Sequence, residues 1–301
     1  MPSRIEPASE TGRRDAAPRR SNASGEIAVV GDVHGCGRSL EALLDRLERE
    51  SPQARTILVG DLLTKGDAPE LVVELLRSRS ASGASLEAVC GNHDRRMLAA
   101  ILAVEHGGEV GDLPGTERRC FERLDRAGLL DAAREILEET VARIELRDSR
   151  GAWTVLHAGL DPRLGLAQTP DEVKWSIKAR PGERHWWDAY AGADGLIVFG
   201  HKPVTTPIRR CVERRPVAVN VDTGCVYGGA LTAYLVGADR FLRVPGLESA
   251  RESGLPREIP RRRRVTPAGD RRGSSARPAA SAAPARRPAD WSSGSAGPAS
   301  A

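Results

Sequence analysis

Three short apolar segments in the first third of the chain each lead into a glycine that is followed by polar side chains able to bind a metal ion. The segments are residues 27–30, 56–59 and 86–90, and their motifs read GDVHG, GDLLTKG and GNHD. A helical pattern follows each motif; after the first, apolar residues between 40 and 47 recur at i, i+3, i+4 and i+7. This repeated order of strand, loop and helix predicts an α/β fold that gathers the polar loops at one edge of a sheet.

Strand patterns dominate the later part of the chain. A helical stretch over about residues 117–141 precedes two alternating segments on either side of the DSRG motif at 148–151, which is typical of a β-hairpin. Further strands are predicted at residues 196–199, 216–221, 230–236 and 240–244. We therefore expect one domain with a mixed rather than a purely parallel sheet.

The two ends of the chain differ in composition from the middle. Residues 1–25 and 246–301 lack hydrophobic periodicity and are rich in Pro, Ser, Ala and Arg. Such segments bury too little apolar area to offset the entropy lost on ordering, so we expect two disordered tails. The folded domain is predicted to span residues 26–245.

The formal net charge of +4 comes from these tails. Residues 1–25 carry +2 and residues 250–301 carry +7, which leaves −5 on the residues between them. The arginine-rich tail, with Arg261–Arg264 in a row, can bind nucleic acid or a polyphosphate-bearing partner electrostatically. GC-rich codons in a solvated tail give the same composition, so both interpretations stay open.

Cysteine content and hydropathy indicate the cellular compartment in which we expect the protein. The chain has five cysteines and no CxxC pair, which favours reduced thiols in a cytoplasmic protein. No run of ~18 apolar residues occurs, and the N-terminus has no apolar signal-peptide core. We therefore expect neither membrane spanning nor secretion.

Side chains suited to metal binding or proton transfer follow five of the predicted strands. They are Asp32, His34, Asp61, Asn92, His93, Asp94, His157 and His201. Oxygen and imidazole ligands together suit Mn²⁺, Fe or Zn²⁺, whereas an oxygen-only set favours Mg²⁺ or Ca²⁺. Two ions about 3.5–4 Å apart, bridged by one carboxylate, activate water and hold both oxygens of an in-line displacement. The pattern therefore predicts phosphoester hydrolysis with two divalent metal ions, Mn²⁺ before Fe or Zn²⁺.

The motifs GDVHG, GDLLTKG, GNHD, HAGL, FGH and VDTGCVYGGALTA occur in the order known from one enzyme family. Over about residues 26–236 the chain resembles the phosphoprotein phosphatase group of calcineurin-like metallophosphoesterases. It looks most similar to bacterial members: diadenosine tetraphosphatases, RNA-repair phosphatases and stand-alone protein phosphatases. The resemblance implies a β-sandwich flanked by helices in an αββα arrangement.

The resemblance also implies a role for each motif residue. Asp32 and His34 would bind the first metal ion, and Asp61 would bridge both ions. A hydroxide bridging the ions would attack phosphorus, and His93 would act as the general acid for the leaving oxygen. Asp94, the adjacent acid, is the carboxylate we expect to support His93. The ligands of the second ion would be Asn92, His157 and His201.

Two positions depart from the usual pattern of that family. Many members have Asp-Arg in the second motif, where this chain has Thr64 and Lys65. Thr64 cannot act as a carboxylate partner of the catalytic histidine, and Lys65 would hold phosphate as a point charge rather than through a bidentate fork. A further phosphate-binding residue is expected between the HAGL and FGH motifs. The candidates are Lys178, Arg180 and Arg184, of which we favour Arg180.

Two other features near these motifs admit more than one interpretation. Trp175, Trp186 and Trp187 are expected to pack in the core, with a platform for stacking a base as the alternative. Asp222 is interpreted as a turn residue rather than a ligand.

The leading functional prediction is a phosphomonoesterase of the serine/threonine protein phosphatase type, acting on a phosphorylated substrate. The alternatives within enzymes are a hydrolase of dinucleoside polyphosphates such as diadenosine tetraphosphate and an RNA-end phosphatase. An alternative of another class is a catalytically weak phosphate- or RNA-binding module, suggested by Thr64, Lys65 and the basic tail.

Overall fold

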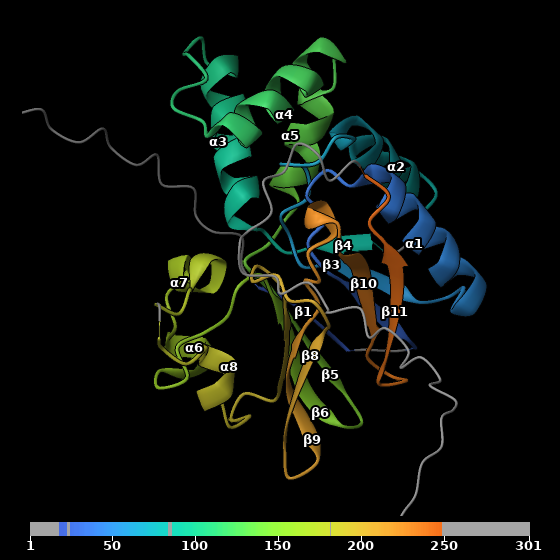
Figure 1. The fold of residues 1–301 in the computed structure, drawn as a ribbon, viewed down its shortest axis with the longest axis vertical. Coiled ribbons are helices and arrows are strands. Elements are labelled where there is room, and N and C mark those ends of the chain that lie inside the picture. Colours follow the sequence, from blue (N-terminus) through green and yellow to red (C-terminus); the bar gives the residue numbers. More distant parts are fainter. Residues whose placement is uncertain (1–17, 23–24, 84–85, 181, 249–301) are drawn as a thin grey trace, which may run out of the picture. The chain divides into compact units, whose positions relative to one another are not determined.

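The computed structural model describes residues 18–22, 25–83, 86–180 and 182–248, which form two β-sheets and the helices that cover them (Figure 1). Most of the two predicted tails, including Arg261–Arg264, lies outside the described residues. Within the described residues, no helix is long and apolar enough to cross a membrane.

One sheet carries the three strands that precede the first polar motifs. Its five strands, in order, are β11 (Arg240–Pro245), β10 (Ala230–Leu235), β2 (Ile27–Val30), β3 (Arg55–Leu58) and β4 (Leu86–Ala88). β2, β3 and β4 run parallel, whereas β10 runs antiparallel to both β2 and β11. The carboxyl ends of the three parallel strands therefore meet at one edge.

The other sheet holds the later strands. Its six strands, in order, are β1 (Arg19–Asn22), β5 (Arg143–Asp148), β6 (Gly151–Leu156), β7 (Leu196–Phe199), β9 (Arg215–Asn220) and β8 (Ile208–Val212). β6, β7 and β9 are parallel, and β5 and β6 form the predicted hairpin, with Asp148 opposite Gly151. Both sheets are mixed, as the sequence predicts.

Helices cover the outer face of each sheet. Five helices accompany the sheet of β2: α1 (Gly37–Glu50), α2 (Pro69–Ala81), α3 (Asn92–Glu105), α4 (Gly115–Arg126) and α5 (Leu130–Glu138). The shorter helices α6 (Gly165–Gln168), α7 (Asp171–Ser176) and α8 (Trp186–Ala189) lie between β6 and β7 in the chain, and a 3₁₀ turn, η1 (Cys225–Tyr227), precedes β10. Pro69 begins α2, as expected for proline at the first helical position.

The alternation of side chains along β2 shows how the layers pack. Ala28 and Val30 belong to the core shared with the helices, whereas Ile27 and Val29 belong to the core that also contains Val155 of β6. The two sheets thus face each other across an apolar layer. A third cluster on the outer side of β7 includes Trp186 and Trp187. The order of layers is helix, sheet, sheet, helix, so the predicted αββα sandwich is confirmed.

Two features differ from the sequence predictions. Residues 1–25 were expected to lie outside the domain, yet Arg19–Asn22 pair in parallel with β5 as strand β1. Polar side chains fit this edge position: Arg20 donates to Glu145 at 2.8 Å, and Ser21 accepts from Arg55. Strand β8 and the three short helices are also absent from the predicted elements, because none has a long periodic pattern.

The tryptophans belong to the core. Trp175, Trp186 and Trp187 are only 4%, 7% and 5% exposed, and both rings of α8 pack against Phe199. The core interpretation is confirmed, because rings this buried present no face on which a base could stack.

Candidate active site

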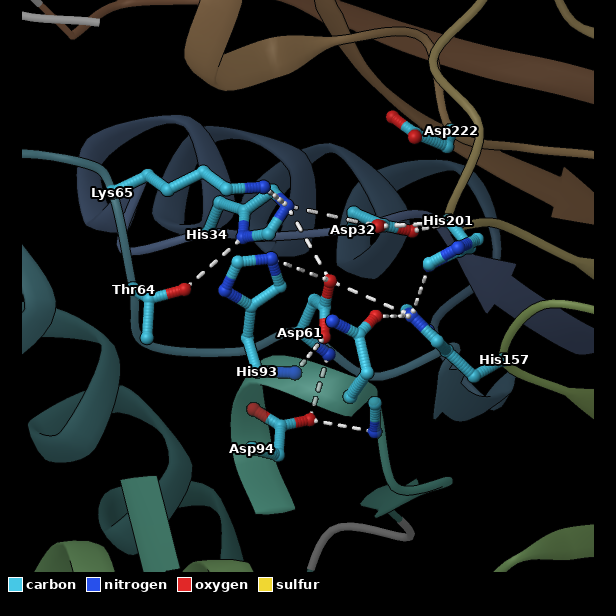
Figure 2. Close-up of polar contacts among 12 residues, drawn as sticks. Asp32, His34, Asp61, Thr64, Lys65, His93, Asp94, His157, His201 and Asp222 are labelled. Atoms are coloured by element: carbon cyan, nitrogen blue, oxygen red, sulfur yellow. Dashed lines mark hydrogen bonds and ion pairs between the residues drawn. The ribbon is translucent and has the colours of Figure 1, made fainter. Parts of the chain in front are cut away.

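The predicted ligands lie together at the carboxyl ends of the parallel strands (Figure 2). Asp32 and His34 follow β2, and Asp61 follows β3, while His157 and His201 follow β6 and β7 of the other sheet. Asn92 begins α3, directly after the loop that leaves β4. Side chains separated by up to 169 positions in the chain thus meet at one place, where both sheets present the same ends of their strands.

Asp61 lies at the centre of this group. Its Oδ2 is 3.5 Å from Nε2 of His34 and 3.4 Å from Nε2 of His157. Ligand atoms that share an ion at about 2.1 Å lie roughly 3–3.5 Å apart, so both spacings fit shared coordination. Asp61 belongs to both clusters of possible ligands at this site: one also includes His34 and His93, and the other also includes His157 and His201. One carboxylate is therefore available to two ions.

Asp32 and His34 form the side of the site nearest β2. His34 Nε2 lies 3.8 Å from Oδ2 of Asp32, and the backbone N–H of His201 donates to Oδ1 of Asp32 at 3.0 Å. Thr64 contacts the other ring nitrogen of His34, with its Oγ1 3.4 Å from Nδ1. Thr64 thus helps to hold His34, and it does not take the place of an acid beside His93.

His157, Asn92 and His201 form the other side. Nδ1 of His157 donates to the backbone carbonyl of Val59 at 2.8 Å, which turns Nε2 toward the centre. That Nε2 lies 3.3 Å from Oδ1 of Asn92 and 3.1 Å from Nδ1 of His201. Nε2 of His201 is buried and has no hydrogen-bond partner in the described part of the chain. A buried nitrogen of this kind is costly unless it meets a cation or a donor.

The charges of the site are balanced only poorly by the protein. Burial raises the pKa of Asp32 well above its ordinary value, and the neighbouring carboxylates of Asp222 and Asp61 add to the rise. Burial likewise raises the pKa of Asp222 to about 6. Burial lowers the pKa of His157, but the neighbouring Asp61 carboxylate outweighs this effect and raises the pKa to about 10. A buried group of three acidic side chains, whose ionised forms are costly without a counter-charge, fits the binding of divalent cations.

The backbone around the site is held in an uncommon conformation. His34, Asp61, Lys65 and His201 have positive φ angles of 49°, 52°, 77° and 68°. Side chains other than glycine rarely adopt this region, and such residues tend to cluster at functional sites. Two glycines allow the carboxylates to approach closely: a Cβ on Gly91 would overlap Asp61 Oδ1, and a Cβ on Gly200 would overlap Asp32 Oδ1.

Asp94 does not support His93 as the sequence prediction expects. Its carboxylate accepts hydrogen bonds from the backbone N–H groups of Asp61 at 2.7 Å, Leu62 at 2.8 Å and Gly91 at 2.9 Å. The side chain thus points back into the loop after β3, and its two oxygens fix the left-handed conformation of Asp61. The predicted support of His93 by Asp94 is therefore wrong. Adjacent residues on a helix point in different directions, so the two side chains do not meet.

The carboxylate beside His93 comes instead from α4. Oε1 of Glu117 lies 2.8 Å from Nδ1 of His93, while Nε2 of His93 faces Asp61 Oδ2 at 3.9 Å. Arg96 contacts both partners, with Nη2 2.7 Å from Glu117 Oε1 and 3.0 Å from His93 Nδ1. Sequence reasoning missed Glu117 because no glycine motif or strand end marks this position, 24 residues beyond His93.

Lysines surround the site. Lys65 Nζ lies 2.8 Å from Nε2 of His34, so the predicted phosphate-binding residue reaches the ligand cluster. Partial desolvation lowers the pKa of Lys178, and the positive charge of Lys65 lowers it further. Lys202 and Arg96 have the same effect but contribute less. The favoured candidate Arg180 is exposed, as is Lys178, and its backbone N–H donates a hydrogen bond to Glu183 at 3.1 Å. The charge of Lys178 thus interacts with Lys65 and Asp61 at the centre of the site.

Oxygen and imidazole donors grouped around one shared carboxylate, with cations at the rim, define a metal-dependent phosphoester hydrolase. The chain belongs to the calcineurin-like phosphoesterase family, which it matches over residues 25–229.

Named relatives agree with this assignment. The chain is 29% identical to an asymmetrical bis(5'-nucleosyl)-tetraphosphatase of Halalkalibacterium halodurans, over 73% of this chain and 94% of the relative. It is 28% identical to a symmetrical bis(5'-nucleosyl)-tetraphosphatase of Chromohalobacter salexigens, over 68% of this chain and 92% of the relative. The fold matches the crystal structure of a candidate diadenosine tetraphosphatase, with a TM-score of 0.57, 24% identity and coverage of 76% of this chain and 97% of that one.

Proposed function

We propose that the protein hydrolyses dinucleoside polyphosphates, with diadenosine tetraphosphate as the representative substrate. This was the alternative to the protein phosphatase prediction, and the names of the relatives favour it. The proposal keeps metal-dependent hydrolysis at phosphorus, but it changes the expected substrate from a phosphoprotein to a nucleotide and the bond that breaks from a phosphoester to a phosphoanhydride.

The metal ligands proposed are those the sequence suggests. One ion would be held by Asp32 and His34 and the other by Asn92, His157 and His201, with Asp61 shared between them. When bound, two divalent ions supply an activated water and neutralise charge on the reacting phosphate. Mn²⁺ is the first choice for this donor set, with Fe and Zn²⁺ as alternatives.

The protein's own groups perform the remaining steps. Asp61 is held by the backbone N–H of His93, which donates to its Oδ1 at 3.0 Å at the start of α3. His93 turns Nε2 toward the ligand cluster, where it can give a proton to the leaving oxygen. Lys65 would leave His34 Nε2 for the substrate phosphate, because a metal-bound nitrogen has no lone pair left for an ammonium group.

The observation that carries the choice of substrate is the distribution of lysine. The chain has only four lysines beside 41 arginines, and three of the four, Lys65, Lys178 and Lys202, interact electrostatically at this site. The charges of Lys65 and Lys178 also act on His201. A chain of phosphates carries several negative charges along its length, so separate cations at the rim suit it better than a single phosphomonoester.

The test is a substrate comparison with Mn²⁺ added. Diadenosine tetraphosphate, a phosphothreonine peptide, p-nitrophenyl phosphate and an RNA with a 2',3'-cyclic phosphate end are compared by kcat/KM. We expect diadenosine tetraphosphate to exceed the peptide by at least tenfold. Products separated by chromatography distinguish asymmetrical cleavage, which gives ATP and AMP, from symmetrical cleavage, which gives two ADP.

The other outcomes point to the remaining predictions. A higher kcat/KM for the phosphopeptide would contradict the proposal in favour of a protein phosphatase, and a higher value for the RNA end would favour RNA repair. Binding of these ligands without turnover of any would favour the non-catalytic module. A cytoplasmic location and a nucleic-acid partner for the arginine-rich tail remain predictions. None of the five cysteines forms a disulfide in the structure, which agrees with the expected reduced thiols.

A further inference from the structure

Glu117 is a buried acid that the predicted machinery does not use. Its residue is 1% exposed, and it lies in the first turn of α4, away from every glycine motif. One oxygen, Oε2, accepts from the hydroxyl of Thr116 at 2.8 Å. The other, Oε1, lies 2.8 Å from His93 Nδ1 and accepts two N–H groups of Arg96. A buried carboxylate is thus fully partnered and directed at one ring nitrogen.

The charge of Glu117 is maintained despite its burial. Burial raises the pKa of Glu117, but the hydrogen bonds from Arg96 and Thr116 outweigh this, and the net pKa lies below the ordinary value. The group is therefore an anion at neutral pH, and an anion can only accept hydrogen bonds.

Two neighbours compete for Nδ1 of His93. Arg96 Nη2 is 3.0 Å away and can only donate, whereas Glu117 Oε1 is 2.8 Å away and can only accept. A histidine that donates a proton from Nε2 as a general acid carries a proton on both nitrogens. Its Nδ1 partner must then be an acceptor, which Glu117 is and Arg96 is not.

We propose that Glu117 is the positioning residue of His93: it accepts the Nδ1 proton, and so holds Nε2 toward the reacting phosphate. The role rests on the proposed function, in which His93 protonates the leaving oxygen. Arg96 fixes Glu117 through two hydrogen bonds to the same oxygen. An acid from α4 thereby supplies the contact that Thr64 cannot make from the second motif.

The kinetic test uses two esters that differ in their need for an acid. Phenyl phosphate has a poor leaving group that requires a proton, whereas 2,4-dinitrophenyl phosphate has one that departs without it. We expect E117Q to lower kcat for phenyl phosphate by about 100-fold, within the usual contribution of a general acid, and to leave 2,4-dinitrophenyl phosphate within about threefold. E117D moves the carboxylate away from His93 by one methylene group, and it is expected to show the same selective loss to a smaller degree. This variant replaces E117Q in the test if E117Q does not fold.

The matched control breaks another ion pair of the same helix. Arg123 of α4 donates to both oxygens of Glu70 in α2, so E70Q removes a comparable anchor of α4 without touching His93. E70Q is expected to affect both esters equally. Combining E117Q with H93A should lower the rate no further than H93A alone, because a residue that acts through His93 has no effect once the ring is absent.

A readout without catalysis comes from histidine ¹⁵N NMR of the metal-free protein, with the His93 signals assigned by their loss in H93A. We expect Nδ1 of His93 to carry the proton in the unsubstituted protein. In E117A the remaining neighbour, Arg96, can only donate, so the proton is expected to move to Nε2.

Equal losses for both esters in E117Q, a further loss in the double variant, or an unchanged His93 tautomer in E117A would overturn the role of Glu117. Absence of turnover of every ester and nucleotide by the unsubstituted protein would instead overturn the proposed function, and the NMR result would still decide whether Glu117 sets the proton on His93.

Discussion

Oδ2 of Asp61 lies 3.4 Å from Nε2 of His157, and the carbonyl of Val59, two residues before Asp61, holds the other nitrogen of that ring at 2.8 Å. The loop that leaves β3 therefore supplies one proposed ligand, Asp61, and also orients a second, His157, that arrives from the opposite sheet. His157 cannot rotate away from Asp61 without losing a buried hydrogen bond, which costs about 1–3 kcal/mol when its partner is left unpaired. This relationship ties the two sheets together at the site.

Replacing Asp61→Asn should abolish most of the activity. The amide keeps the shape but loses the charge shared between the two clusters, so we expect kcat to fall about 1000-fold, equivalent to roughly 4 kcal/mol of transition-state stabilisation. Steady-state hydrolysis of diadenosine tetraphosphate measures it. Asp148→Asn, which alters an acid that pairs with Arg150 in the hairpin turn, is the control and should retain full activity. Comparable rates in both variants would count against the site.

Divalent ions should stabilise the fold. At a free Mn²⁺ concentration of 100 times Kd, binding of one ion to the native state alone adds about 2.7 kcal/mol. For a domain of this size that corresponds to a rise in Tm of roughly 5–10 °C, which calorimetry detects and EDTA should reverse. His157→Ala should reduce the rise. A Tm that does not respond to Mn²⁺ would argue against ligands preassembled as the structure has them.

Lys178 and Arg180 should differ in substrate binding. Both residues are exposed, but the charge of Lys178 interacts with Lys65 and Asp61, whereas Arg180 contacts Glu183 through its backbone. Lys178→Ala is expected to raise KM for diadenosine tetraphosphate by about tenfold, the size of one charge-assisted hydrogen bond. Arg180→Ala should change KM less than twofold. The reverse order would restore the assignment of Arg180 made from the sequence.

Asp94 should matter for stability more than for proton transfer. Asp94→Ala leaves three buried backbone N–H groups without their acceptor, so we expect a loss of about 3 kcal/mol in the free energy of unfolding, measured with urea. Activity should fall equally for good and poor leaving groups, since the effect reaches the chemistry through Asp61. A loss confined to poor leaving groups, with unchanged stability, would show that Asp94 supports His93 after all.

The sequence was sufficient to predict that the proposed ligands lie together, because their positions follow from local rules. Strand β2 is predicted with the bounds it has, Ile27–Val30, and glycine motifs after parallel strands bring their side chains to one edge. Asp32, Asp61 and His157 lie together for this reason. The hairpin at Asp148–Gly151 was predictable in the same way, from its turn residues.

Contacts made by the outer helices were not predictable by those rules. Glu117 reaches His93 only because α4 packs beside α3, and no pattern in the sequence specifies that packing. Asp94 illustrates the opposite error: adjacency in sequence suggested a contact with His93, but the side chain turns back to the loop of Asp61. Strand β1 was missed because Arg19 and Arg20 are polar, and such an edge strand lacks the apolar alternation by which strands are predicted.

The proposed site requires Asp61 to serve two ions at once. The direct measurement is the number of Mn²⁺ ions bound per chain, by elemental analysis after dialysis against a fixed free Mn²⁺ concentration, in the unsubstituted protein and in Asp61→Asn. We expect two ions per chain in the former and fewer than one in the latter. A single ion in the unsubstituted protein, or two ions retained by Asp61→Asn, would contradict the account.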